Sequence, residues 1–118
     1  MATLLAFSAE HVCRLTGLSM RQLRYWDDTG FFHPQYADED RKRPHSRIYS
    51  FRDLVGLRVI ARLAKEHKVP LQQLRRVGKW LSEQYEAPWS SLRFYVAGRK
   101  VYFDDPLTNA RMIGEPHG

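Results

Sequence analysis

The sequence has 118 residues, 43% of them hydrophobic, which is enough for one small core without disulfide or metal support. Its single cysteine, Cys13, excludes an internal disulfide and argues against a zinc cage, and the absence of a membrane-length apolar run or signal-peptide pattern predicts a cytoplasmic location. The formal net charge of +6 suits a polyanionic partner, but many proteins with such a charge bind none, so the placement of the charges must decide.

A first helix is predicted over residues 9–16. Ser8 can cap its exposed backbone amides, and Phe7 stands five residues before Val12, the spacing of a hydrophobic staple. Gly17 can adopt the left-handed conformation that ends a helix. The pattern therefore indicates a short helix followed directly by a tight turn.

A second helix is predicted to start after that turn and to continue to about Thr29. Ser19 is its N-cap, and Gln22 three residues later completes a capping box. Gly30 is again suited to end the helix. Two helices joined by a tight turn indicate a helix-turn-helix, although any helical hairpin could share these signals.

The segment after Gly30 predicts a wing, meaning two short strands around a charged loop. Residues 31–32 are two phenylalanines that read as a first strand, and residues 47–49 read as the returning strand. The polar residues 33–46 lie between them.

Two supporting helices are predicted next. Ser50 and Asp53 form a capping box for a helix over about residues 51–66, and a further helix follows Pro70. Both carry apolar residues at helical spacing, so we expect them to face a core.

Beyond Pro88 the apolar period falls to two residues. Residues 92–96 and 100–103 are rich in aromatic and β-branched side chains, and the residues between them include a glycine, so a β-hairpin is predicted. Residues 104–118 show little periodicity and no clear terminating element, which suggests the N-terminal piece of something longer. The predicted fold is mainly α, a winged helix-turn-helix over residues 1–85, with the hairpin and tail at 86–118.

The predicted second helix has two faces. Met20, Leu23 and Trp26 follow one another at intervals of three and should pack inward. The side chains expected on the other face are Arg21, Arg24, Tyr25 and Asp28. Arginine can pair with guanine edges or phosphates, and tyrosine can hydrogen-bond to phosphate. A solvated face is the alternative for arginines taken singly, but the preceding helix-turn favours entry into the major groove.

The predicted wing loop is strongly basic on its returning side. Residues 38–47 read DEDRKRPHSR, in which three acids precede the cations. Such a cluster suits a phosphate backbone, whereas the alternative is a disordered charged loop whose acids partly cancel its bases. Because the bases lie beside the returning strand, we favour a wing that presses Arg43 and Arg47 against DNA.

No catalytic or metal-binding pattern is visible. The five histidines are dispersed without a helical pair or a neighbouring cysteine, and there is no Gly-rich phosphate loop or nucleophile elbow. Asp27 and Asp28 are adjacent on a helix, where side chains diverge, so they form no catalytic dyad. Cys13 is expected to be a small core residue. We therefore expect no enzyme, no cofactor and no metal.

Residues 5–81 resemble the N-terminal domain of MerR-family transcription regulators. The resemblance is carried by FSAEHVCRLTGLSMRQLRYWDDTGFF, RIYSFRDLVGLRVIARL and VPLQQLRRV. It implies contacts with double-stranded DNA from the second helix and the wing, a phosphate contact at the base of the wing, and a homodimer on an inverted repeat. The resulting candidate DNA-binding residues are Arg21, Gln22, Arg24, Tyr25, Arg41, Lys42, Arg43, His45, Arg47 and Tyr49.

The C-terminal part departs from that family. Its members typically continue into a long helix that pairs with its twin, whereas here Pro88 and a hairpin pattern follow. Residues 90–116, SSLRFYVAGRKVYFDDPLTNARMIGEP, are similar to antitoxins of VapBC-type systems that join a MerR-like head to a further domain. The alternative function is therefore an antitoxin that neutralises a PIN-domain ribonuclease and represses its own operon. An excisionase-like protein that bends DNA is a third reading.

Overall fold

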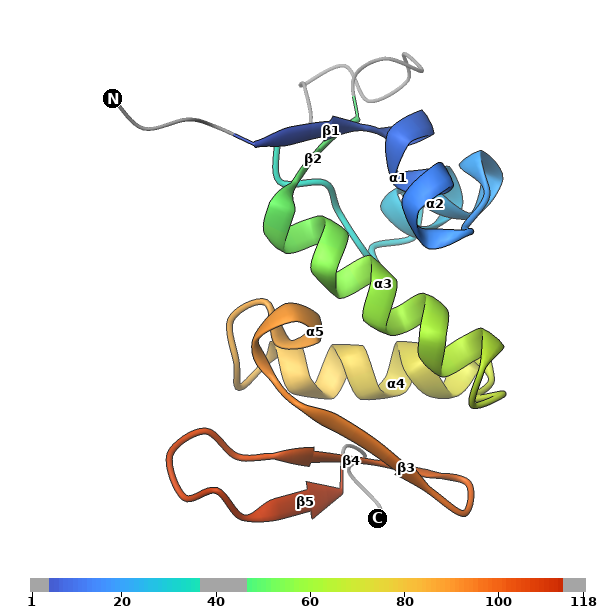
Figure 1. Cartoon of the computed structure of the whole chain (residues 1–118). Helices are drawn as coiled ribbons and strands as arrows, with labels where there is room; N and C mark the ends of the chain where they lie inside the picture. The colour runs from blue at the N-terminus through green and yellow to red at the C-terminus, as the bar shows by residue number, and fades with distance from the viewer. Residues whose placement is uncertain (1–4, 37–46, 114–118) are drawn as a thin grey trace. The chain divides into compact units, whose positions relative to one another are not determined.

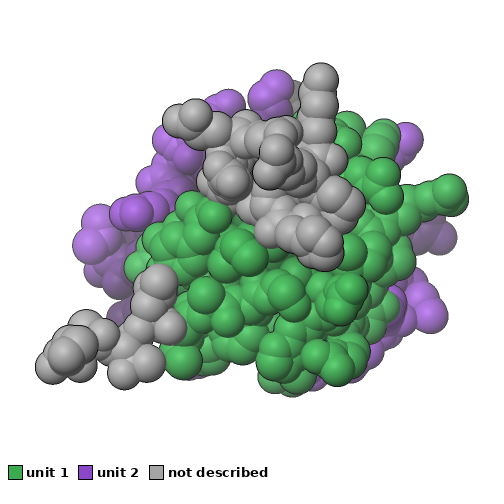
Figure 2. Space-filling view, turned by 90° about the horizontal axis from the view of Figure 1, so that it is seen from above, with its two compact units in different colours: residues 1–58 green, residues 59–118 purple. Residues whose placement is uncertain are grey.

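The computed structural model describes residues 5–36 and 47–113 (Figure 1). The predicted wing cations Arg41, Lys42, Arg43 and His45 lie outside the described residues. The chain divides into two compact units, unit 1 with residues Met1–Arg58 and unit 2 with residues Val59–Gly118, which are coloured separately in Figure 2. This division differs from the predicted domain boundary at residue 85, which stays a prediction.

The first predicted helix is confirmed with its cap. Strand β1 (Ala6–Ser8) leads into α1 (Ala9–Thr16), and the Ser8 hydroxyl accepts a hydrogen bond from the amide of His11 at 3.2 Å. Gly17 ends α1 with a φ of 79°, in the left-handed region. The turn that follows holds Leu18, which is buried.

The second predicted helix is confirmed as α2 (Met20–Asp28), and its capping box is complete. The backbone amide of Gln22 donates to the Ser19 hydroxyl, and the backbone amide of Ser19 donates to the side-chain oxygen of Gln22. Both distances are 3.0 Å. Met20 was expected to pack inward but is 40% exposed. Met20 is the first residue of the helix and precedes Leu23 and Trp26, and the buried stripe that they form does not extend to it.

The prediction of a strand at residues 31–32 is wrong. The backbone amides of Phe31 and Phe32 both donate to the carbonyl of Trp26, at 2.9 and 3.1 Å, so these residues wrap the end of α2. The Phe31 ring packs edge-on against Trp26 with centroids 5.2 Å apart. Strand β2 (Ile48–Ser50) instead pairs antiparallel with β1, so Phe7 lies opposite Tyr49.

The supporting helices are confirmed as α3 (Phe51–Lys65) and α4 (Leu71–Ser82). The Ser50 hydroxyl accepts from the amide of Asp53 at 3.0 Å, and the Asp53 carboxylate accepts from the amide of Ser50 at 2.9 Å. The boundary between the two units falls inside α3, so the first half of this helix belongs to unit 1 and the second half to unit 2.

The predicted hairpin is confirmed, and the structure adds two elements to it. A short helix α5 (Pro88–Ser91) precedes β3 (Phe94–Ala97), which turns through Gly98 into β4 (Lys100–Asp104). Strand β5 (Arg111–Ile113) then pairs antiparallel with β4, giving the order β3-β4-β5. Part of the segment that the sequence analysis named a tail is therefore a strand.

A short turn makes this third strand possible. The Asp105 amide donates to the carbonyl of Ala110, and the Asn109 amide donates to the carbonyl of Asp105, both at 2.8 Å. The Asp105 carboxylate also accepts from the hydroxyl of Thr108 at 2.7 Å. Proline and asparagine in this stretch therefore mark a turn between two strands rather than the end of ordered structure.

The buried apolar residues are distributed over both units. In unit 1 they include Val12, Leu18, Leu23, Trp26, Tyr49, Leu54 and Leu57, and in unit 2 Ile60, Leu74, Val77, Leu81, Trp89, Val101 and Phe103. Among the helices in residues 5–36 and 47–113, none combines the length and apolar character needed to cross a bilayer.

Candidate nucleic-acid interface

Helix α2 presents the face that its sequence period predicts. Leu23, Trp26 and Asp27 are buried, whereas the residues displaced from them around the helix are exposed, namely Arg21, Arg24, Tyr25 and Asp28. Tyr25 is 59% exposed, which is unusual for a large aromatic side chain. One face of α2 is thus a surface of two cations and an aromatic hydroxyl, with one carboxylate at its end.

Gln22 is committed in part to the cap of α2. Its side-chain oxygen accepts the hydrogen bond from the Ser19 amide, which leaves the NH₂ group and one lone pair of the oxygen for other contacts. The cap also fixes the first turn of α2, from which Arg21 projects. The sequence prediction that Gln22 is a DNA-binding residue stays a prediction.

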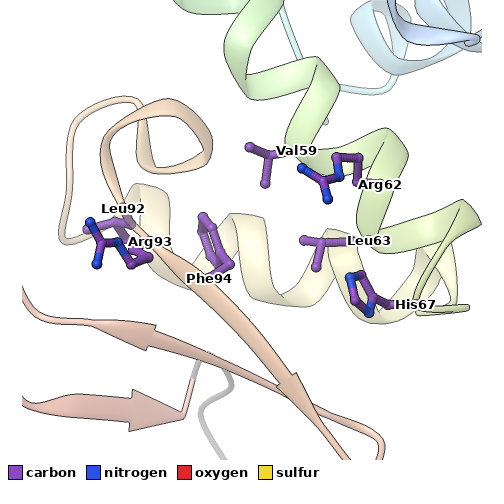
Figure 3. A pocket seen from close by; sticks show the side chains of 7 residues that line it. All are labelled: Val59, Arg62, Leu63, His67, Leu92, Arg93 and Phe94. Carbon is purple, nitrogen blue, oxygen red and sulfur yellow. The ribbon is translucent and has the colours of Figure 1, made fainter.

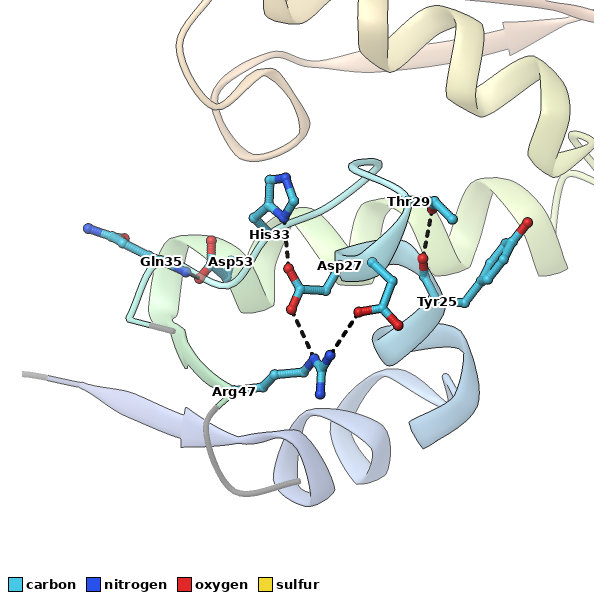
Figure 4. A network of polar contacts seen from close by, with 8 residues as sticks. Tyr25, Asp27, Thr29, His33, Gln35, Arg47 and Asp53 are labelled. Atoms are coloured by element: carbon cyan, nitrogen blue, oxygen red, sulfur yellow. Dashed lines mark hydrogen bonds and ion pairs between the residues drawn. The ribbon is translucent and has the colours of Figure 1, made fainter. Parts of the chain in front are cut away.

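A buried carboxylate organises the opposite side of α2. The Asp27 side chain is fully buried, and its two oxygens accept from different partners (Figure 4). The Nδ1 atom of His33 lies 2.7 Å from one oxygen, and the Nε atom of Arg47 donates to the other at 2.9 Å. We call Asp27, Asp28, His33 and Arg47 the Asp27 cluster.

Arg47 lies inside this cluster and not on an open wing. Its side chain is 7% exposed, and its guanidinium also donates to the Asp28 carboxylate at 3.1 Å. Our expectation of an arginine pressed against DNA did not foresee this burial. Two carboxylates compensate the buried cation, which would otherwise be costly.

Tyr49 is also more enclosed than a phosphate contact would suggest. Its side chain is 1% exposed, and its hydroxyl has no hydrogen-bond partner among the residues that the structure describes. Burial, with the nearby Asp27 carboxylate, raises the pKa of this phenol well above its usual range. The phosphate contact that the resemblance implies for Tyr49 therefore stays a prediction.

The described residues on both sides of segment 37–46 are held by carboxylates. On one side, the Gln35 amide donates to Asp53 at 2.8 Å, and the Tyr36 amide donates to the carbonyl of Ile48 at 3.1 Å. On the other side, Arg47 is held by the Asp27 cluster. The described residues that flank this segment are thereby held to α2 and to the start of α3 (Figure 4).

The described residues give little support to a metal site or to a reactive cysteine. Within 5–36 and 47–113, no group of three histidine, cysteine or acidic side chains is arranged to hold a metal ion. The Cys13 thiol is half-buried, and this burial raises its pKa, which disfavours the reactive thiolate.

The role of Asp27 was missed by the sequence analysis. A signal was present, because Asp27 lies four residues after Leu23 and therefore on the buried stripe of α2. An acid on such a stripe requires a cationic or hydrogen-bonding partner. The sequence does not say which of the many cations supplies it, and the partner, Arg47, lies twenty residues away.

Comparison with known proteins identifies the family to which the helical part of the chain belongs. The family model described as MerR HTH family regulatory protein matches residues 7–79, which is more than half of the chain. The match covers α1 to most of α4 and leaves the β3-β4-β5 sheet outside it. No curated protein and no solved structure matches the chain.

Proposed function

The chain belongs to the MerR family of helix-turn-helix regulatory proteins, and we propose that it reads a specific double-stranded DNA operator with α2 in the major groove. DNA-binding transcription regulation is what this family membership supports. The proposal that α2 is the recognition helix is supported by its exposed face, described above. The proposal that segment 37–46 contacts the DNA backbone is supported by the cations in its sequence and by the family resemblance.

The observation that carries the proposal is the two-sided character of α2. Arg21, Arg24 and Tyr25 share its exposed face, while Leu23, Trp26 and Asp27 hold the other face in place. A helix anchored in this way can present its side chains to base edges without first having to order itself. Arginine is suited to bidentate contacts with guanine, and tyrosine to a phosphate.

The Asp27 cluster supports a positioning role for Arg47. Arg47 directly follows segment 37–46, and its guanidinium is hydrogen-bonded to Asp27 and Asp28 at the end of α2. We infer that Arg41, Lys42, Arg43 and His45 act as the backbone contacts, and that Arg47 supports DNA binding through its bonds to α2 and not by touching DNA.

The test is fluorescence anisotropy of the full chain on DNA from directly upstream of its own gene, against scrambled DNA, over a salt series. Arg24→Ala should weaken specific binding by about ten- to a hundredfold and relax sequence preference. Arg43→Ala should weaken specific and scrambled DNA alike and reduce the salt slope by about one. Arg76→Ala, which removes an exposed cation of α4, is the matched control and should change little.

Either of two results would overturn the proposal. Equal binding to native and scrambled DNA would remove sequence-specific recognition. An effect of Arg76→Ala as large as that of Arg24→Ala would mean that overall positive charge, and not the face of α2, governs binding.

A homodimer on an inverted repeat is part of the proposal, and sedimentation equilibrium with and without operator DNA tests it.

A second candidate function is that of an antitoxin. This function is favoured by the β3-β4-β5 sheet. MerR-family regulators typically have a long helix at this point of the chain, through which two copies pair, and here the sheet takes its place. Co-purification of the full chain with a PIN-domain ribonuclease encoded beside it, and loss of ribonuclease activity in that complex, would support this function.

A further inference from the structure

Unit 2 contains an open pocket between the second half of α3 and the start of β3 (Figure 3). Its volume is about 320 Å³, at the small end of the range found for ligand sites. It is lined by Val59, Arg62, Leu63, His67, Leu92, Arg93 and Phe94. All seven residues belong to unit 2, and none of them is acidic.

The lining separates into an apolar part and a cationic part. Leu63 and Leu92 are buried, and the Phe94 ring points from β3 toward α3 across the pocket (Figure 3). This ring is itself held in place by stacking on Trp89, with centroids 5.1 Å apart. The apolar part is therefore formed by side chains that are already ordered before any ligand arrives.

Basic side chains occur on both sides of the pocket. The guanidinium of Arg62 points from α3 into the space above Phe94, and His67 lies just after the helix, beyond Leu63 (Figure 3). Arg93 is on the opposite side, and its guanidinium points away from the ring (Figure 3). Arg62 is therefore the cation best placed to meet a charged group of a bound molecule.

The ion pair that Arg62 already makes does not prevent this. Its Nε atom lies 3.3 Å from the Glu66 carboxylate, in a pair whose two side chains are both more than half exposed. Such pairs contribute little stability, and a guanidinium has five N–H donors, so its terminal nitrogens can serve a second carboxylate. A hydrogen bond from this guanidinium to a ligand carboxylate would be charge-assisted and therefore stronger than a neutral one.

We propose that this pocket binds a small organic carboxylate with an aromatic or branched aliphatic body. The body would lie against Leu63, Leu92 and Phe94, and the carboxylate would accept hydrogen bonds from Arg62. The proposal concerns a ligand site in unit 2 and does not depend on the DNA-binding role of α2.

The experiment is isothermal titration calorimetry of the full chain at pH 7 with 2-naphthoate, a rigid carboxylate of suitable size, and with 2-naphthamide, its neutral analogue. We expect 2-naphthoate to bind with a Kd below about 1 mM, a limit that separates a site from nonspecific contact. We expect 2-naphthamide to bind at least tenfold more weakly. Arg62→Gln should reduce naphthoate binding at least tenfold, and Arg62→Lys should restore part of it.

Arg76→Gln removes an exposed cation of the same unit outside the pocket and serves as the matched control, with no expected change. Circular dichroism of each variant shows whether it folds, and Arg62, as an exposed residue, should tolerate both replacements. The proposal is wrong if the wild-type chain does not bind 2-naphthoate, or if the amide binds as well as the acid. It is also wrong if Arg62→Gln and Arg76→Gln have the same effect.

Discussion

The two compact units hold their charged groups in opposite ways. In unit 1 the Asp27 carboxylate and the Arg47 guanidinium are buried together. In unit 2 the comparable group lies at the surface of the sheet, where Asp104 accepts from the Tyr95 hydroxyl at 2.7 Å and from Arg111 at 3.2 Å. The Arg111 guanidinium also stacks 3.6 Å from the centre of the Tyr95 ring.

This difference shows in which unit the relative position of two segments has to be fixed by charged groups. A buried ion pair adds little net stability compared with an apolar pair, but it fixes a geometry because each unpaired charge would be costly. Unit 1 uses one where α2 meets the flank of segment 37–46. Unit 2 relies on apolar packing, in which the fully buried Phe103 contacts the rings of Trp80 and Tyr85 edge-on. Its surface charges can therefore vary with less consequence for the fold.

The largest expected effect is that of Asp27→Ala. Among the described residues, it leaves the buried Arg47 with only the exposed Asp28 as partner, and it should lower the free energy of unfolding by about 3–5 kcal/mol. Urea unfolding of the full chain, followed by circular dichroism, measures this. Asp28→Ala is the matched control and should cost about 1 kcal/mol or less. Equal costs for the two variants would show that the buried carboxylate is not the main partner of Arg47.

Tyr49→Phe should act in the opposite direction. It removes a buried hydroxyl that has no partner among the described residues, and should raise the free energy of unfolding by about 1–3 kcal/mol. In unit 2, Tyr85→Phe should instead lower it slightly, because the Tyr85 hydroxyl donates to Asp105 at 2.9 Å. The same urea titrations compare them. A loss of stability in Tyr49→Phe would indicate that its hydroxyl is hydrogen-bonded in solution, and a loss of DNA affinity alone would favour the phosphate contact.

Gly30→Ala in unit 1 and Gly98→Ala in unit 2 should lower the free energy of unfolding by similar amounts. Gly30 and Gly98 have φ values of 80° and 61°, and an alanine in the left-handed region costs about 1–2 kcal/mol. A Cβ atom at Gly30 would approach Nε2 of His33 only to 3.9 Å, and one at Gly98 would meet nothing within 4 Å. Similar shifts in the urea midpoint are expected for Gly30→Ala and Gly98→Ala. A clearly larger effect at Gly30 would show that the Asp27 cluster is more sensitive to backbone strain than the sheet.

The smallest effect concerns the pH dependence of the surface group in unit 2. The hydrogen bond from Tyr95, with support from Arg111, holds the pKa of Asp104 below its usual value of 3.8. A carboxyl group with a lowered folded-state pKa stabilises the protein fully above the unfolded value, and this contribution is lost as the pH falls through the folded value.

Asp104→Asn should therefore lower the urea midpoint slightly at pH 7 and pH 5, and the difference from wild type should disappear between pH 4 and pH 2. Asp105 also has a lowered pKa, through its hydrogen bonds with Thr108 and Tyr85. It is present in both proteins, so its titration affects their stability equally and does not contribute to the difference. A difference that grows as the pH falls would contradict the assignment.

Local sequence signals were sufficient to predict helices α1 to α4 and the exposed face of α2. The caps at Ser8, Ser19 and Ser50 were predictable because each joins groups three residues apart, so the signal is contained in a short window. The exposure of Arg21, Arg24 and Tyr25 followed from the helical period for the same reason. The hairpin of β3 and β4 was predictable because its turn residues lie between its two strands.

The pairing of distant segments could not be predicted from such local signals. Residues 31–32 had the composition of a strand, yet the end of α2 engages their amides and β1 takes the place beside β2. Likewise, the composition of the basic loop predicted a DNA-facing Arg47, whereas a carboxylate twenty residues earlier holds it inside. A local pattern specifies what a segment can form, but the partner of a strand edge or a buried charge depends on which groups the whole fold brings within hydrogen-bonding distance.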